Sequence, residues 1–147
     1  MRADRDAFFG SILATLDHLL AADTHWMKRF AGASPDVASL DYIRAVPLPE
    51  LVRGITFPAF TRLRGEREAM DVAVIDFTHE ATAALYALPL RYASSAGESH
   101  TKLCGLVLRH VFNHQTHHRG QVTTWFSQLG IDVGVTASSA LIPEIPA

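Results

Sequence analysis

The hydrophobic positions of the chain fall into three long stretches with the spacing of amphipathic helices. Large apolar residues recur every three or four positions in residues 6–30, 58–88 and 99–128. This is the period of an α-helix that buries one face. The pattern therefore predicts an all-α helix bundle with three long helices.

Breakers and capping residues indicate where these helices begin and end. Pro58 suits the first turn of the second helix, and Pro89 is expected to end it. Ser99 or Thr101 can cap the N-terminus of the third helix, and Gly130 suits its C-cap. The second and third helices thus each have residues in the sequence that mark their start and their end.

The first helix, predicted from Asp6 to Phe30, has two faces without the Lys and Glu typical of a surface. One carries large apolar side chains. The other carries small or polar residues, namely Ser11, Thr15, His18, Ala22 and His25. We interpret this helix as buried on both sides, which calls for a fourth covering helix. The alternative is that His18 and His25 lie on a lightly polar surface. Asp23, on the large-apolar face, is expected to need a basic partner or a helix end.

Two segments lack a helical period. Residues 31–57 contain Gly32, Pro35, Pro47 and Pro49, and they predict a connection with one short turn. A connection of this length allows the first two helices to run parallel. Residues 90–97 predict a short extended segment followed by a turn.

The third helix places two histidines where its apolar stripe should continue. Val107 and Val111 begin the stripe, and Val122, Trp125 and Leu129 resume it. His114 and His118 occupy the positions between, one turn apart on the same face. Burying two unpaired imidazoles is costly, and a shared divalent metal would offset that cost. The alternative is two core histidines, each with its own hydrogen-bond acceptor.

Other histidines of the same helix leave the register open. His110 lies four residues before His114, so this pair has the same spacing as His114 and His118. His110 and His117 together lie on a neighbouring face of the helix. Both fall at the edge of the stripe, so we interpret them as flanking. A metal needs at least a third protein ligand, which the helical period does not identify.

Gly120 and Arg119 carry two further expectations. A glycine inside a helix costs about 1 kcal/mol relative to alanine. We therefore expect a neighbouring helix to pack closely against Gly120. Arg119 is a candidate partner for Asp23, against the alternative of a solvated surface residue.

Composition narrows the class of protein. The 147 residues suit one domain over residues 1–147, and the net charge of −2 without a Lys/Arg block argues against nucleic acid as a partner. No apolar run reaches transmembrane length, which argues against a membrane. The single Cys104 excludes an internal disulfide and suits a reducing compartment. We expect a cytoplasmic protein.

Three segments of the chain resemble the DinB-like (DinB/YfiT) superfamily of metal-binding four-helix bundles. They are FFGSILATLDHLLAADTHWMKRF, HVFNHQTHHRGQV and QLGIDVG. The resemblance covers about residues 7–135. It implies one divalent metal ion held by three histidines, His18 from the first segment with His114 and His118 from the second.

The resemblance also implies a function. Three imidazoles leave coordination positions open, as in a catalytic site. Characterised members resemble metal-dependent transferases of low-molecular-weight thiols, so a small-molecule thiol and an electrophile are the expected partners, with hydrolysis as another reaction. The family is named for induction by DNA damage. The alternative is a non-enzymatic, metal-stabilised bundle that acts as a stress-response binding protein. Imidazoles suit Zn, Ni or Fe, so the metal identity and the catalytic residues stay open.

Family members usually begin with a helix before the segment FFGS, and this chain starts just after that helix. A bundle of three helices would leave an apolar groove uncovered. Either the chain forms a homodimer through the groove, or the natural protein begins upstream and supplies the helix, which is the interpretation we favour. The chain as it stands is expected to self-associate.

Overall fold

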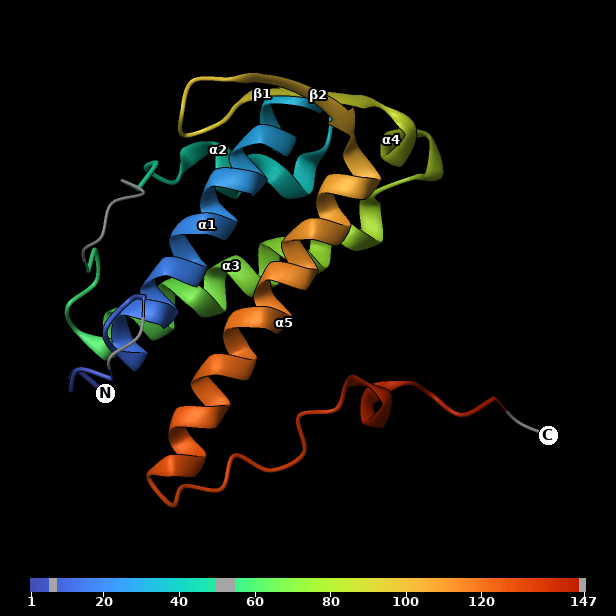
Figure 1. Cartoon of the computed structure of the whole chain (residues 1–147). Coiled ribbons are helices and arrows are strands. Elements are labelled where there is room, and N and C mark those ends of the chain that lie inside the picture. Colours follow the sequence, from blue (N-terminus) through green and yellow to red (C-terminus); the bar gives the residue numbers. More distant parts are fainter. Residues whose placement is uncertain (6–7, 50–54, 146–147) are drawn as a thin grey trace.

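The computed structural model describes residues 1–5, 8–49 and 55–145, and it confirms the all-α fold. The three long helices are α1 (Ile12–Ala33), α3 (Phe60–Glu80) and α5 (Cys104–Gln128). Helix α1 contacts both of the others. Helices α1 and α3 start at the same end of the bundle, which the long connection between them allows, and α5 runs in the opposite direction (Figure 1). The predicted start of the first helix at Asp6 lies outside the described residues, and the prediction that residues 8–11 are helical is wrong, because Ser11 is the N-cap of α1.

Helix α1 is buried on both of its faces, as its two unusual stripes predicted. Leu20 and Met27 of the large-apolar face are buried, and so are Thr15 and Ala22 of the opposite face. The buried Thr15 hydroxyl donates to the Ser11 carbonyl oxygen at 3.0 Å. The shorter elements α2 and the strand β1, defined below, contact α1 in addition to α3 and α5. Within the described ranges there is no fourth long helix.

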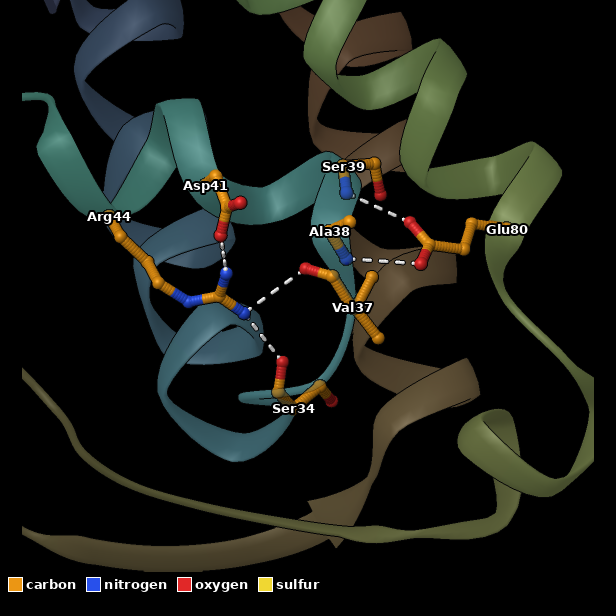
Figure 2. Close-up of polar contacts among 7 residues, drawn as sticks. All are labelled: Ser34, Val37, Ala38, Ser39, Asp41, Arg44 and Glu80. Atoms are coloured by element: carbon orange, nitrogen blue, oxygen red, sulfur yellow. Dashed lines mark hydrogen bonds and ion pairs between the residues drawn. The ribbon is translucent and has the colours of Figure 1, made fainter.

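The described residues of the connection between α1 and α3 form two short helical elements, η1 (Ala38–Leu40) and α2 (Asp41–Ala45), where one turn was predicted. The C-terminus of α3 fixes the first of them. The Glu80 carboxylate accepts hydrogen bonds from the backbone N–H groups of Ala38 and Ser39, at 3.0 and 2.8 Å (Figure 2). These donors are free because the first N–H groups of a helix have no partner within it.

Arg44 of α2 also stabilises this connection, through the segment that leaves α1. Its guanidinium donates to the carbonyl oxygens of Ser34 and Val37, at 2.7 and 3.1 Å, and pairs with Asp41 (Figure 2). The segment that leaves α1 is thereby tied to its own end. Leu40 and Ile43 complete the attachment, because both are fully buried in the core.

The predicted end of the second helix at Pro89 is wrong. Helix α3 ends at Glu80, and a separate helix, α4, spans Ala83–Ala87. The break lies at Thr82, which is extended and accepts a hydrogen bond from the Leu85 N–H at 3.2 Å. Threonine is a preferred N-cap residue because its hydroxyl oxygen accepts a hydrogen bond from a free N–H of the first turn, so Thr82 starts a new helix.

The predicted extended segment is a β-hairpin of β1 (Pro89–Ala93) and β2 (Ser99–Leu103), paired antiparallel. It lies across the end of the bundle where α1 finishes and α5 begins (Figure 1). Ser99 and Thr101 therefore belong to β2, and the prediction that either caps the third helix is wrong. Leu103 is the N-cap of α5 and makes no side-chain capping bond.

The C-terminal end of α5 confirms the prediction for Gly130. This glycine has φ of 71°, and its N–H donates to the Ser127 carbonyl at 2.9 Å, while the Ile131 N–H donates to the Phe126 carbonyl at 2.9 Å. This is the Schellman arrangement, in which a left-handed residue ends a helix. Beyond it the chain leaves the bundle and forms only a short 3₁₀ turn, η2 (Ser138–Leu141) (Figure 1). None of the described helices is long and apolar enough to span a membrane.

The prediction that a helix packs closely on Gly120 is wrong. A Cβ atom added to Gly120 would have no heavy atom within 4 Å, because this side of α5 faces solvent. Packing in this structure therefore does not require a glycine at position 120.

Gly120→Ala is expected to stabilise the protein by about 0.5–1 kcal/mol, since alanine removes the entropic cost of glycine in a helix. The matched control is Gly105→Ala in the same helix. There the new Cβ would lie 3.1 Å from the Tyr86 Cβ and 3.3 Å from its carbonyl oxygen, so a loss of stability is expected. Urea unfolding of both variants measures the difference, and a destabilised Gly120→Ala would contradict the structure.

Candidate metal centre

The apolar stripe of α5 faces α1, and the two stripe histidines face α1 with it. Val107, Val111 and Val122 are buried, and His118 is only 7% exposed. His114 is half-buried. The four-residue spacing in the sequence therefore places two imidazoles at the α1–α5 interface.

His18 of α1 meets this pair. Its Nε2 lies 3.3 Å from the Nε2 of His114, and the Nε2 of His118 lies 3.1 Å from the same atom. All three ligand atoms lie within 4.8 Å of one another. Two nitrogens each about 2.05 Å from one tetrahedral ion would lie about 3.3 Å apart. The three side chains therefore fit a single divalent ion.

The electrostatic environment keeps these imidazoles neutral. Burial, followed by the repulsion of the neighbouring His118 and His18, lowers the pKa of His114 to about 4. Burial is also the main cause that lowers the pKa of His18 and of His118. A neutral imidazole offers a nitrogen lone pair, which is the form that binds a metal.

These pKa shifts predict how the stability of the chelator-treated protein depends on pH. The folded pKa of His114, about 4, lies below the value of about 6.5 for an unfolded histidine. Between these two values the unfolded chain binds more protons, so stability falls as the pH is lowered from about 6.5 towards 4. Urea unfolding across this range should show a shallower decline for His114→Ala than for the unchanged chain. Equal slopes would contradict the assignment.

Gln121 holds His118 in the form that a metal requires. Its Oε1 lies 2.7 Å from the Nδ1 of His118. A carbonyl oxygen only accepts, so Nδ1 carries the proton and donates it to this bond. The Nε2 of His118 is then left with a lone pair directed at the centre of the cluster. Such a partner behind a metal-binding histidine fixes its tautomer and ring orientation.

Gln121→Ala is expected to weaken metal binding by about 10- to 100-fold, because His118 loses the bond that orients it. Gln128→Ala is the control, since Gln128 is an exposed residue of the same helix. Competition against a coloured chelator measures both affinities. A Gln121 variant that binds as tightly as the Gln128 variant would argue against this role.

Phe9 covers one side of the cluster. Its ring stacks on His18 with centroids 4.1 Å apart and meets His118 edge-on at 5.4 Å. The helical period of the sequence placed Phe9 inside the first helix, on its large-apolar face, whereas α1 begins only at Ile12. Its contact with the histidines depends on the turn before α1, which helical periodicity does not describe.

Two buried carboxylates of α1 anchor the surrounding elements. Asp17 accepts hydrogen bonds from the backbone N–H groups of Thr56 and Phe57, at 2.9 and 2.7 Å, and so ties the segment before α3 to α1. It is adjacent in sequence to His18. The position of His18 is therefore coupled to the start of α3.

Asp23 has the basic partner that its place on an apolar face predicted, but the partner is Arg67 of α3. Gln115, next to His114, donates to the same carboxylate. Arg119 is exposed and takes no part, so its predicted pairing with Asp23 is wrong. The helical period placed Arg119 near the cluster, but it could not show that Arg67 of α3 pairs with Asp23 instead.

The remaining histidines of these helices lie outside the three-histidine cluster. His110 has its ring centroid 6.1 Å from that of His114, and His117 is exposed with its Nε2 3.4 Å from the Gln121 amide nitrogen. His25 contacts the Pro49 carbonyl oxygen through Nε2 at 2.6 Å, which ties the long connection to α1.

Comparison with known proteins identifies the family of the chain. Neither the curated proteins nor the solved structures give a match to the chain. The family model described as "DinB family" matches residues 1–141, nearly the whole sequence. The chain belongs to the DinB family.

Proposed function

We propose that the chain binds one divalent metal ion through His18, His114 and His118 and uses it to transfer a low-molecular-weight thiol to an electrophile. The observation that carries the proposal is the convergence of three Nε2 atoms, with neighbouring pairs 3.3 and 3.1 Å apart. Family membership supports it, because the resemblance described above implies metal-dependent thiol transferases. Zn, Ni and Fe all suit three imidazoles.

The ligand set leaves room for a substrate. Within residues 1–5, 8–49 and 55–145 the cluster comprises three protein ligands and no fourth. An ion held in this way supplies Lewis acidity, which lowers the pKa of a thiol or water at an open position. The protein's own part is to keep the three imidazoles neutral and oriented, and Phe9 shields one side from solvent.

Thiol transfer suits these surroundings better than hydrolysis does. Hydrolysis at a metal commonly uses a nearby carboxylate to take a proton from water. The buried carboxylate beside His18, Asp17, is occupied by two backbone N–H groups. Asp23 accepts from Arg67 and Gln115 through Oδ2, and its Oδ1 is buried away from solvent. A thiol depends less than water does on a carboxylate to take its proton, because the pKa of a free thiol is already about 8.5.

The test follows the consumption of a thiol by a reactive electrophile. The protein, purified without a histidine tag, is loaded with one equivalent of Zn²⁺ or Ni²⁺ and mixed with a panel of small thiols and 1-chloro-2,4-dinitrobenzene. Turnover above the rate of the free metal, lost in His118→Ala and retained in His79→Ala, is the expected result. Metal binding without turnover for any thiol would instead support the alternative, a metal-stabilised stress-response binding protein.

A further inference from the structure

A cavity lies at the junction of α1, α5 and the hairpin, one helical turn along α5 from the histidine cluster. Its volume is about 430 Å³. This lies within the range of small-molecule sites, about 300–1,000 Å³. The rings of Trp26, Tyr92 and His110 line it. Trp26 contacts both of the other rings edge-on, with centroids 5.1 Å from Tyr92 and 5.4 Å from His110.

The rest of the lining is aliphatic and partly open to solvent. Val107 is buried, whereas Leu103 and Leu106 are 48% and 53% exposed. These two leucines extend the apolar lining to the mouth of the cavity, and a contiguous exposed apolar patch can mark a ligand-binding groove. Aromatic faces and leucine side chains together suit a flat or branched apolar body.

The charge around this cavity is positive. Lys102 also lines it, and in the antiparallel register Lys102 is opposite Leu90, so both lie on the face of the hairpin that packs on the bundle. Within the described part of the chain the Lys102 ammonium makes no ion pair. The acidic residue of the hairpin, Glu98, lies 3.9 Å from His100 and does not line the cavity.

Arg29 adds a second positive charge behind the aromatic wall. Its guanidinium carbon lies 4.3 Å from the centroid of Trp26 and 4.8 Å from that of Tyr92. It donates to the Ala93 carbonyl oxygen at 3.0 Å, and no carboxylate among the described residues neutralises it. The rings are therefore held by a cation that has no acidic partner.

We infer that this cavity binds a small organic anion with an aromatic or branched apolar body, such as an arylcarboxylate. The apolar body would lie between Trp26, Tyr92 and Leu106, and the carboxylate would face Lys102 at the rim. The inference does not depend on the proposed thiol transfer, because the lining residues are distinct from His18, His114 and His118.

The test is calorimetric titration of the whole chain with 2-naphthoate and with the neutral 2-naphthamide. The carboxylate should bind more tightly by roughly fivefold, the upper range for an exposed ion pair. Lys102→Glu should remove this preference. The matched control is Arg91→Glu, because Arg91 is on the neighbouring position of the hairpin and faces the other way.

Three results would overturn the inference. One is the absence of heat of binding for both compounds at millimolar concentration. Another is an equal affinity for the acid and the amide, or equal weakening by both charge reversals. The third comes from sedimentation of the same samples: a dimer that dissociates in Lys102→Glu would show that a second copy of the chain, and not a small anion, covers this cavity.

Discussion

Replacing His114 by alanine is expected to abolish stoichiometric metal binding, the largest effect of any single substitution in this protein. His114 is the central member of the cluster, because its Nε2 is the atom that both His18 and His118 approach. Loss of even a residue behind a metal ligand costs about 10- to 100-fold in affinity, so loss of the central ligand should cost more than about 100-fold. Equilibrium dialysis followed by metal analysis measures the bound ion per chain.

The controls are the histidines that the structure places outside the cluster. His117→Ala changes the exposed residue beside His118, and His79→Ala and His100→Ala change histidines of α3 and β2. Each should retain about as much metal as the unchanged chain. Equal loss in His114→Ala and His117→Ala would place the metal elsewhere on α5.

Replacing Arg67 by alanine is expected to destabilise the fold by about 3 kcal/mol, the cost of leaving a buried charge without its partner. The Asp23 side chain is only 3% exposed, and Arg67 is its ionic partner. Burial already raises the pKa of Asp23 against the opposing effect of Arg67, so removing the guanidinium should raise that pKa further. Urea unfolding at neutral pH gives the free energy of unfolding.

Arg64→Ala is the matched control. Arg64 and Arg67 both lie on α3, and each pairs with an acid four residues later, Glu68 and Asp71. The Arg64 side chain is 70% exposed, so its loss should cost less than about 0.5 kcal/mol. Similar costs for the two substitutions would mean that the buried pair contributes no more than a surface one.

The elements with a regular period were predictable from the sequence. The stripe of α5 predicted that His114 and His118 face the core, and the two faces of α1 predicted its burial. Gly130 predicted the end of α5 because only a left-handed residue completes that motif. The length of the connection between α1 and α3 allowed their parallel course but did not determine it.

Features that depend on contacts between distant segments were not predictable. Thr82 breaks the second helix through a capping bond that a hydrophobic pattern does not contain. Arg67, not Arg119, reaches Asp23 because α3 packs on that side of α1. His18 was identified as the third member of the cluster from the family resemblance. The helical period of α5 does not show which side chain of α1 faces its two histidines. The homodimer and the cytoplasmic location stay predictions.

The absorption spectrum of the cobalt(II) form tests the central claim, that three histidines hold one ion with an open position. Titration with Co²⁺ should give bands that saturate at one ion per chain, because the structure presents one cluster within its described residues. Addition of 2-mercaptoethanol should then produce a new sulfur-to-metal charge-transfer band as the thiolate binds. Saturation at one ion followed by no spectral change on adding the thiol would show a closed site and contradict the account.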